Sequence, residues 1–170
     1  EGKIDQATYF EIISKKTASL FMACAELGAT AARAPREWIE ALQTYAFNLG
    51  LAFQVTDDVL DLVADPEQLG KNAGVDLAQG RGISVVVDAA ETSAAVATKT
   101  APVTLGQDTA PGPFKEGLLA GNSIEKAIQK GHEKAAEFAQ SAIDALQVLP
   151  ESAALGELRA LAHTVVDRDH

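Results

Sequence analysis

The stretch Phe53-Gln54-Val55-Thr56-Asp57-Asp58-Val59-Leu60-Asp61 lies in a long apolar pattern that runs from Trp38 to about Ala64. At an α-helical spacing of ~100° per residue, its polar members fall within an arc of about 100°, and apolar residues cluster on the opposite side. The polar members are Gln54, Asp57, Asp58 and Asp61, and the apolar ones are Leu51, Val55, Val59 and Leu62. The pattern predicts one long helix with an acidic face and an apolar face.

The acidic face has no cation near it in the sequence. No lysine or arginine occurs between Arg36 and Lys71. Two carboxylates ~6 Å apart repel each other by roughly 3 kcal/mol at an effective dielectric constant of about 20. Because no neighbour three or four positions away offsets this repulsion, we expect a divalent cation at this face.

The composition bounds the fold and the partners. A chain of 170 residues is the size of one domain, and 47% apolar residues with only 5% aromatic ones are typical of packed helices. An all-α fold is therefore predicted. The formal net charge of −10 argues against a nucleic-acid partner, which needs a basic surface. An anionic ligand would need a metal ion beside it.

Other features of the sequence bear on where the protein is located in the cell and on whether it is part of a longer protein. The only cysteine is Cys24, which excludes an intrachain disulfide and suits a cytoplasmic protein. We expect its side chain in the core. No run of eighteen apolar residues occurs, so no transmembrane segment is expected. Because the sequence starts at Glu1 with a helical pattern almost at once, we expect a fragment of a longer protein.

Capping and turn residues indicate further helices. Helices are predicted over residues 9–28, 36–64, 83–97, 123–147 and 153–166, with connections at 69–82 and 98–113. Thr8 and Gly28 suit the start and the end of the first helix. Ser123 and Ser152 are suited to cap the last two.

Lys16 lies on an otherwise apolar face of the first predicted helix. At an unbroken helical period, this face is shared by Tyr9, Ile13, Leu20, Ala23 and Leu27. A lone lysine there would extend past its neighbours into solvent. Together with the aspartates and with Lys71, however, Lys16 completes an alternation of cations and carboxylates. That alternation suits a diphosphate chelated by Mg²⁺, which takes carboxylates and water, with lysines on the phosphate oxygens.

Three motifs together resemble the C-terminal half of the trans-isoprenyl diphosphate synthases, the polyprenyl synthetase family. They are Lys16-Thr17, the stretch from Phe53 to Asp61, and Gly70-Lys71-Asn72-Ala73-Gly74-Val75-Asp76-Leu77. Their order and spacing agree with that family. The resemblance implies a helical bundle of the isoprenoid synthase type, of which residues 1–170 are the C-terminal portion. Residues 1–82 would carry the motifs, 83–113 a variable segment and 114–170 the C-terminal helices.

The resemblance also implies roles for single residues. Mg²⁺ would be bound, directly or through water, by Asp57, Asp58 and Asp61. The substrate diphosphate would be held by Lys16, Thr17, Gln54, Lys71 and Arg81. Arg81 stands where the family usually has a lysine, and it keeps the positive charge. The residues expected to be catalytic are Lys16, Asp57, Asp58 and Lys71.

The implied activity is the condensation of an allylic prenyl diphosphate with isopentenyl diphosphate, by a homodimer. The family's first aspartate-rich motif and its basic residues for isopentenyl diphosphate precede this half, so we expect the 170-residue chain alone to be inactive. Two alternatives stay open. One is a class I terpene cyclase of the same fold, against which the Gly70 to Leu77 element argues. The other is a non-catalytic or truncated chain that pairs with a catalytic partner.

Overall fold

The computed structural model describes residues 6–63 and 113–168, and every regular element within them is helical. The elements are α1 (Gln6–Ile13), a π-helix (Ser14–Ala18), α2 (Ser19–Ala31), α3 (Arg36–Val63), α7 (Pro113–Ala145), a 3₁₀-helix (Leu146–Val148) and α8 (Ala153–Val166). The prediction of an all-α fold is confirmed. The predicted helix 83–97, the loop 69–82 and nearly all of the connection 98–113 lie outside the described residues.

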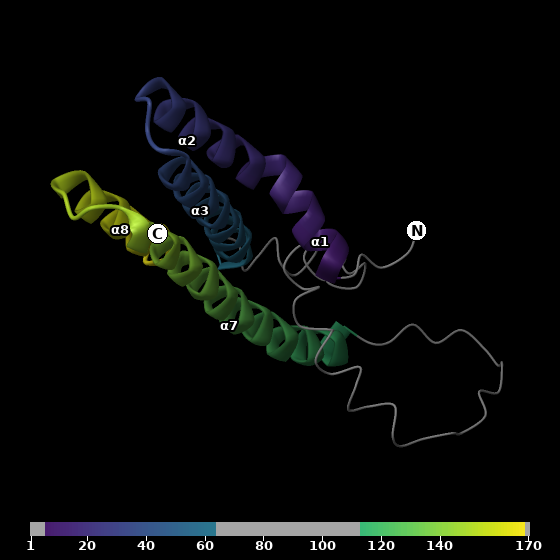
Figure 1. Ribbon diagram of the computed structural model, residues 1–170. Helices are drawn as coiled ribbons and strands as arrows, with labels where there is room; N and C mark the ends of the chain where they lie inside the picture. The colour runs from purple at the N-terminus through teal and green to yellow at the C-terminus, as the bar shows by residue number, and fades with distance from the viewer. Residues whose placement is uncertain (1–5, 64–112, 169–170) are drawn as a thin grey trace, which may run out of the picture.

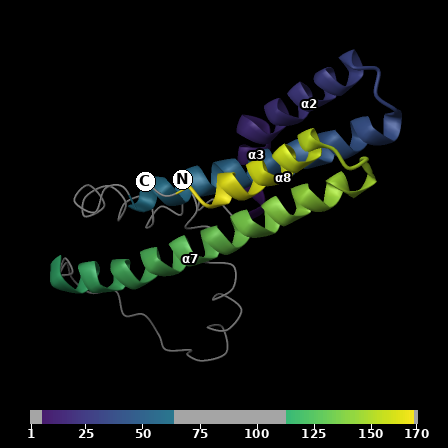
Figure 2. The same cartoon turned by 90° about the vertical axis from the view of Figure 1, so that its left-hand side faces the viewer.

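Helix α3 is central to the arrangement. The segments α1, π-helix and α2 follow one another as a single bent rod that packs along α3 (Figure 1). Helix α7 packs along another side of α3, and α8 folds back onto both of them. In Figure 2, α3 and α8 lie between α2 and α7. The acidic motif is therefore carried by the helix that the other elements surround.

The core consists of two clusters along α3. The first, called here the site-end core, comprises Tyr9, Ile13, Ala18, Leu51, Val55, Val59, Ala127 and Ala135. The second, the far-end core, comprises Tyr45, Ala46, Leu49, Ala52, Ala139, Ala142, Leu146, Leu155, Ala162 and Val165. Alanine is frequent in both, and its small side chain lets helices approach closely. Burial of Leu51, Val55 and Val59 confirms the apolar face predicted for α3.

The starts of α3 and α8 confirm the sequence signals, whereas the start of α7 does not. Helix α3 begins at Arg36, and the Ser152 hydroxyl accepts a hydrogen bond from the Leu155 backbone N–H at 3.1 Å, which caps α8. The cap predicted at Ser123 is wrong, because this residue lies inside α7. That helix starts instead at Pro113, and proline is favoured in the first turn because its missing N–H is not needed there.

The limits predicted for the first rod are also wrong. Thr8 lies inside α1, and Gly28 lies inside α2. A Cβ atom at Gly28 would meet nothing within 4 Å, so this position does not require glycine. The rod ends at Ala31 with Ala32 as its cap, Arg33 follows with a positive φ of 57°, and the Ala34 N–H donates to the Ala29 carbonyl. This is the usual left-handed helix end, formed here without glycine.

The π-helix explains why the apolar face of this rod was predicted wrongly. The Ser19 N–H donates to the Ser14 carbonyl, five residues back, so the turn contains one residue more than an α-helical turn. The buried positions therefore step from Ile13 to Ala18. The predicted continuation is on the outside instead, with Leu20 65% and Leu27 70% exposed.

The exposure of two further side chains of the rod follows from this extra residue. Lys16 is exposed, and so is Cys24, which corrects the expectation that the cysteine is in the core. On the opposite side, α3 approaches the π-helix at Gly50. A Cβ atom added to Gly50 would lie 2.7 Å from the Ala18 Cα. The lack of a side chain at Gly50 thus allows the close contact between α3 and the π-helix.

Candidate functional site

A chain of hydrogen bonds joins α1, the π-helix and α3 beside the aspartate motif. The Tyr9 hydroxyl donates to Asp58 Oδ2 at 2.6 Å, and Gln54 Nε2 donates to Asp58 Oδ1 at 2.9 Å. The Thr17 hydroxyl donates to Gln54 Oε1 at 2.6 Å. We call this set Tyr9, Asp58, Gln54 and Thr17 the polar network. It brings together three residues that the sequence predicts for the site and one that it does not.

The polar network is largely enclosed. Tyr9 is 4% exposed and Gln54 is 6% exposed, while Asp58 is half-buried. Burial, and next the negative charge of Asp58, raise the pKa of the Tyr9 phenol well above its usual range. Tyr9 therefore remains protonated at neutral pH and acts only as a donor toward the carboxylate.

Asp57 binds a cation from the other end of the sequence. The Arg168 Nη2 donates to Asp57 Oδ1 at 2.9 Å, and the guanidinium lies 4.4 Å from the centre of the Phe53 ring. Arg168 follows α8 and is 111 residues away in the chain. It offsets part of the repulsion between the aspartates of α3, for which the neighbouring sequence supplies no cation. The side chains of both partners remain about one third exposed, so solvent weakens the pair.

The described carboxylates suit a hard cation, although they are not gathered into a closed site. Within residues 6–63 and 113–168, no three histidine, cysteine, aspartate or glutamate side chains form a group able to hold a metal ion. Arg168 bonds to one Asp57 oxygen only, and Asp61 is exposed. Mg²⁺ is commonly held by one or two carboxylates together with phosphate oxygens and water. The donor set fits this kind of ion.

The remaining predicted site residues divide into two groups. Lys16 is exposed on the π-helix, next to Thr17. Lys71 and Arg81 lie outside the described residues, so their roles stay predictions.

Sequence reasoning missed Tyr9 and Arg168 as parts of the site. Tyr9 was grouped with an apolar face, although a buried tyrosine hydroxyl normally has a polar partner, and this was the available signal. For Arg168, no local pattern indicates a contact with a residue so far away in the chain.

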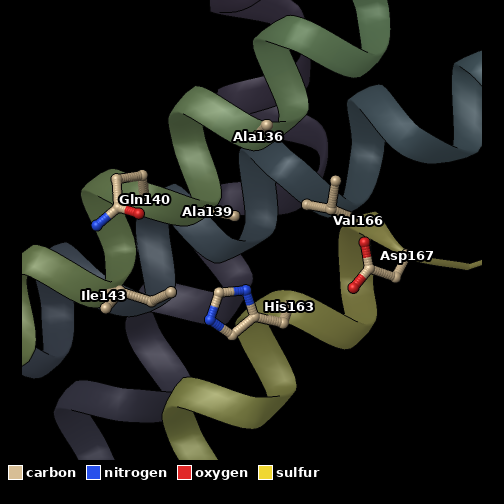
Figure 3. Close-up of a pocket in the computed structure, with 7 residues that line it drawn as sticks. All are labelled: Ala136, Ala139, Gln140, Ile143, His163, Val166 and Asp167. Carbon is tan, nitrogen blue, oxygen red and sulfur yellow. The ribbon is translucent and has the colours of Figure 1, made fainter.

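A small pocket lies elsewhere, between α7 and α8. Its volume is about 190 Å³, and it is lined by Ala136, Ala139, Gln140, Ile143, His163, Val166 and Asp167. Figure 3 shows His163 and Asp167 on α8 and its following turn, opposite Gln140 on α7. The pocket includes none of the aspartates of α3, and we do not assign the site to it.

Among the described helices, none has the length and hydropathy that a membrane crossing requires.

Known proteins of one family are similar to this chain over nearly all of its length. Residues 1–115 match the family described as polyprenyl synthetase. The octaprenyl diphosphate synthase of Haemophilus influenzae is 35% identical over 170 residues, which are 100% of this chain and 51% of that protein. The chain thus spans about half the length of the curated relatives it matches.

Solved structures show the same fold. The geranylgeranyl pyrophosphate synthetase of Pyrococcus horikoshii superposes with a TM-score of 0.70 at 30% identity, over 99% of this chain and 51% of that one. The polyprenyl synthase of Caulobacter crescentus, complexed with calcium and isoprenyl diphosphate, gives a TM-score of 0.67 at 32% identity, over 96% and 50%. The family match over residues 1–115, together with the likeness in sequence and fold, establishes that this chain belongs to the polyprenyl synthetase family.

Proposed function

We propose that the protein carrying this chain is a prenyltransferase that condenses an allylic diphosphate with isopentenyl diphosphate into a longer trans-prenyl diphosphate. The observation that carries the proposal is the polar network, which fixes the Thr17 turn against the aspartate motif of α3. Lys16 precedes Thr17 in the same turn, so in a family of diphosphate synthases this arrangement supports a diphosphate site between Lys16 and the carboxylates of α3. That is the surrounding that a metal-bound diphosphate leaving group needs.

The metal proposed for this chain is Mg²⁺, held by Asp57 and Asp61 with Asp58 in support. Asp61 is exposed, and Asp57 keeps one oxygen free of Arg168. Both Asp58 oxygens accept hydrogen bonds, although each retains a second lone pair. When bound, the ion would neutralise charge that develops on the departing diphosphate. The calcium bound by the Caulobacter relative is consistent with this choice, because both ions prefer oxygen ligands.

Lys16, Thr17, Lys71 and Arg81 are proposed to hold the diphosphate. Lys16 is exposed and free to extend its ammonium group toward an anion. The Thr17 hydroxyl proton is bonded to Gln54, so direct binding through this hydroxyl would exchange that bond for one to a phosphate oxygen. Gln54 uses both amide atoms inside the polar network. It would therefore contribute to diphosphate binding by orienting Thr17.

The exposed leucines of α2 support an isoprenoid substrate. Leu20 and Leu27 lie on one face of that helix, in the turns that follow Lys16. Residues seven apart share a helix face. An allylic diphosphate bound with its head at Lys16 would find an apolar surface for its tail there.

A homodimer in the cytoplasm is part of the same proposal. The thiol of Cys24 is exposed and unpaired, and a reducing compartment preserves a thiol of this kind. The dimer is proposed from the resemblance to the family, and sedimentation of the full-length protein would test it.

The activity is tested by incubating the full-length protein with Mg²⁺, labelled isopentenyl diphosphate and a series of allylic diphosphates. We expect an elongated prenyl diphosphate. The 170-residue chain alone should give little or no product, and vigorous elongation by it would contradict the view that the other half of the family's length is required. Failure of the full-length protein with every allylic diphosphate would refute the proposed function.

A further inference from the structure

Tyr9 is anchored in the core yet reaches the aspartate motif. Its hydroxyl bonds to Asp58, which is 49 residues away in the sequence. Its ring packs edge-on against Phe10, with ring centres 5.3 Å apart, and Phe10 packs in the same way against Phe138 of α7. The tyrosine is thus fixed by its hydrogen bond to α3 and by an aromatic neighbour that itself packs on α7.

We propose that Tyr9 is a positioning residue for diphosphate binding: through Asp58 and Gln54 it fixes the orientation of Thr17 and thereby of the turn that carries Lys16. This inference rests on the proposed function, because it assumes that the turn receives a diphosphate. It concerns the binding of the allylic substrate, since the network ends at Thr17 and touches no residue expected to bind isopentenyl diphosphate.

The direction of each hydrogen bond follows from the Asp58 carboxylate. A carboxylate only accepts, so the NH₂ end of Gln54 must face Asp58. The amide oxygen of Gln54 then faces the π-helix, and the Thr17 hydroxyl must donate to it. Tyr9 holds the second carboxylate oxygen and prevents Asp58 from rotating away from Gln54. The Asp58 carboxylate therefore sets the orientation of Gln54 and Thr17, and the Tyr9 hydroxyl holds that carboxylate in place.

The backbone around Thr17 makes this orientation consequential. Thr17 and Lys16 both belong to the π-helix, whose wide turn is an uncommon feature found frequently at functional sites. Ala18, the last residue of that turn, is in close contact with Gly50 of α3. The turn is therefore held to α3 by backbone packing at Ala18 and by a directed hydrogen bond at Thr17.

The chain offers a matched control for Tyr9. Tyr45 is also buried, and its hydroxyl donates to the Leu158 backbone carbonyl at 2.8 Å in the far-end core. Replacing either tyrosine with phenylalanine removes one hydroxyl and one hydrogen bond. Only the substitution at Tyr9 changes the polar network.

The experiment compares Tyr9→Phe and Tyr45→Phe in the full-length protein. Both variants should lose a few degrees of melting temperature. Tyr9→Phe should raise the KM for the allylic diphosphate, and the Kd for inorganic pyrophosphate with Mg²⁺ measured by calorimetry, by about tenfold. Its KM for isopentenyl diphosphate should stay within about twofold of wild type. Tyr45→Phe should leave all three constants within about twofold.

A Tyr9→Phe variant that matches Tyr45→Phe in KM and Kd would overturn the proposal. A wild-type protein that neither elongates nor binds pyrophosphate would instead refute the proposed function, and the role of Tyr9 with it. The two failures are distinguished by the wild-type measurement alone.

A second variant tests the route through Asp58. Asp58→Asn should raise the pyrophosphate Kd, and combining it with Tyr9→Phe should add little, because both changes interrupt the same chain of bonds. Fully additive losses would overturn the proposal. If Tyr9→Phe does not fold, Gln54→Leu replaces it, because it breaks the same chain of bonds at a residue that binds no metal, and an unchanged Kd for pyrophosphate would then overturn the proposal.

Discussion

The two ends of the bundle use the same residue type in different ways. Tyr9 and Tyr45 are both buried in clusters built on α3, and both hydroxyls donate to an oxygen of another element. At the far end the acceptor is the backbone carbonyl of Leu158, and the bond serves packing of α8 on α3. At the site end the acceptor is the Asp58 carboxylate, which continues into the polar network. Under the role proposed for Tyr9, the acceptor, rather than burial, decides whether a core tyrosine serves stability or the site.

The largest expected effect separates the aspartates of the two ends. Asp57→Ala in the full-length protein should reduce turnover by about 100-fold or more, because it removes a proposed metal ligand, while the fold persists. The control is Asp144→Ala on α7, whose carboxylate accepts from Gln140 at the surface. Turnover and circular dichroism of both variants are the measurements. A near-normal rate for Asp57→Ala would contradict the metal role.

The next effect concerns two glycines that lie in helices. Gly50→Ala should lower the free energy of unfolding by about 1–3 kcal/mol, since the new methyl group would collide with Ala18. Gly28→Ala should raise it by roughly 0.5–1 kcal/mol, because alanine favours the helix and space is free there. Denaturant unfolding measures both. Equal effects of the two substitutions would show that the contact between α3 and the π-helix is looser than described.

A smaller effect is expected from the two arginine pairs. Arg168→Met should destabilise the protein by about 1 kcal/mol, because it leaves Asp57 without its cation and exposes the Phe53 ring. Arg159→Met, which breaks an exposed pair with Glu151, should have about half that effect or less. Thermal unfolding at low and high salt tests the comparison. A larger loss of stability in Arg159→Met than in Arg168→Met would contradict the prediction.

The last effect, the pH dependence of the two tyrosines, is confined to strongly alkaline solution. Burial raises the pKa of Tyr45 to about 12, from an ordinary value of 10.0, and the pKa of Tyr9 is raised as well. When the pKa of a phenol is higher in the folded protein than in the unfolded chain, the phenol contributes fully to stability below pH 10. This contribution is lost as the pH rises through the pKa of the folded protein. Stability should therefore fall above pH 10, and less steeply in Tyr45→Phe. Urea unfolding between pH 8 and pH 11 measures this. If the assignment is wrong, the free energy of unfolding will fall equally steeply with pH in wild type and in Tyr45→Phe.

Much of the fold could be predicted because long regular patterns dominate it. The apolar face of α3 repeats without interruption over many turns, and Ser152 marks the start of α8 with a common cap. The π-helix could not be predicted, since the sequence Ser14-Lys15-Lys16-Thr17-Ala18 contains no residue that demands it. One extra residue in that turn changed which side of α2 is buried.

Only those parts of the site that form short sequence motifs could be predicted. The aspartates, Gln54 and the Lys16-Thr17 pair form recognisable motifs, and the structure joins Thr17, Gln54 and Asp58 directly. The contact between Arg168 and Asp57 depends on how α8 returns along α3, which no local pattern records. The bond from Tyr9 depends in the same way on the packing of α1.

Helix α3 runs through both clusters as one unbroken element of 28 residues, ~42 Å long. Neither end of the bundle can therefore melt without removing the support of the other. We expect the amide protons at the middle of α3 to exchange with solvent only when the whole bundle opens. The aspartate motif lies in the last turns of this helix, so we expect its amide protons to exchange with solvent sooner than those at the middle.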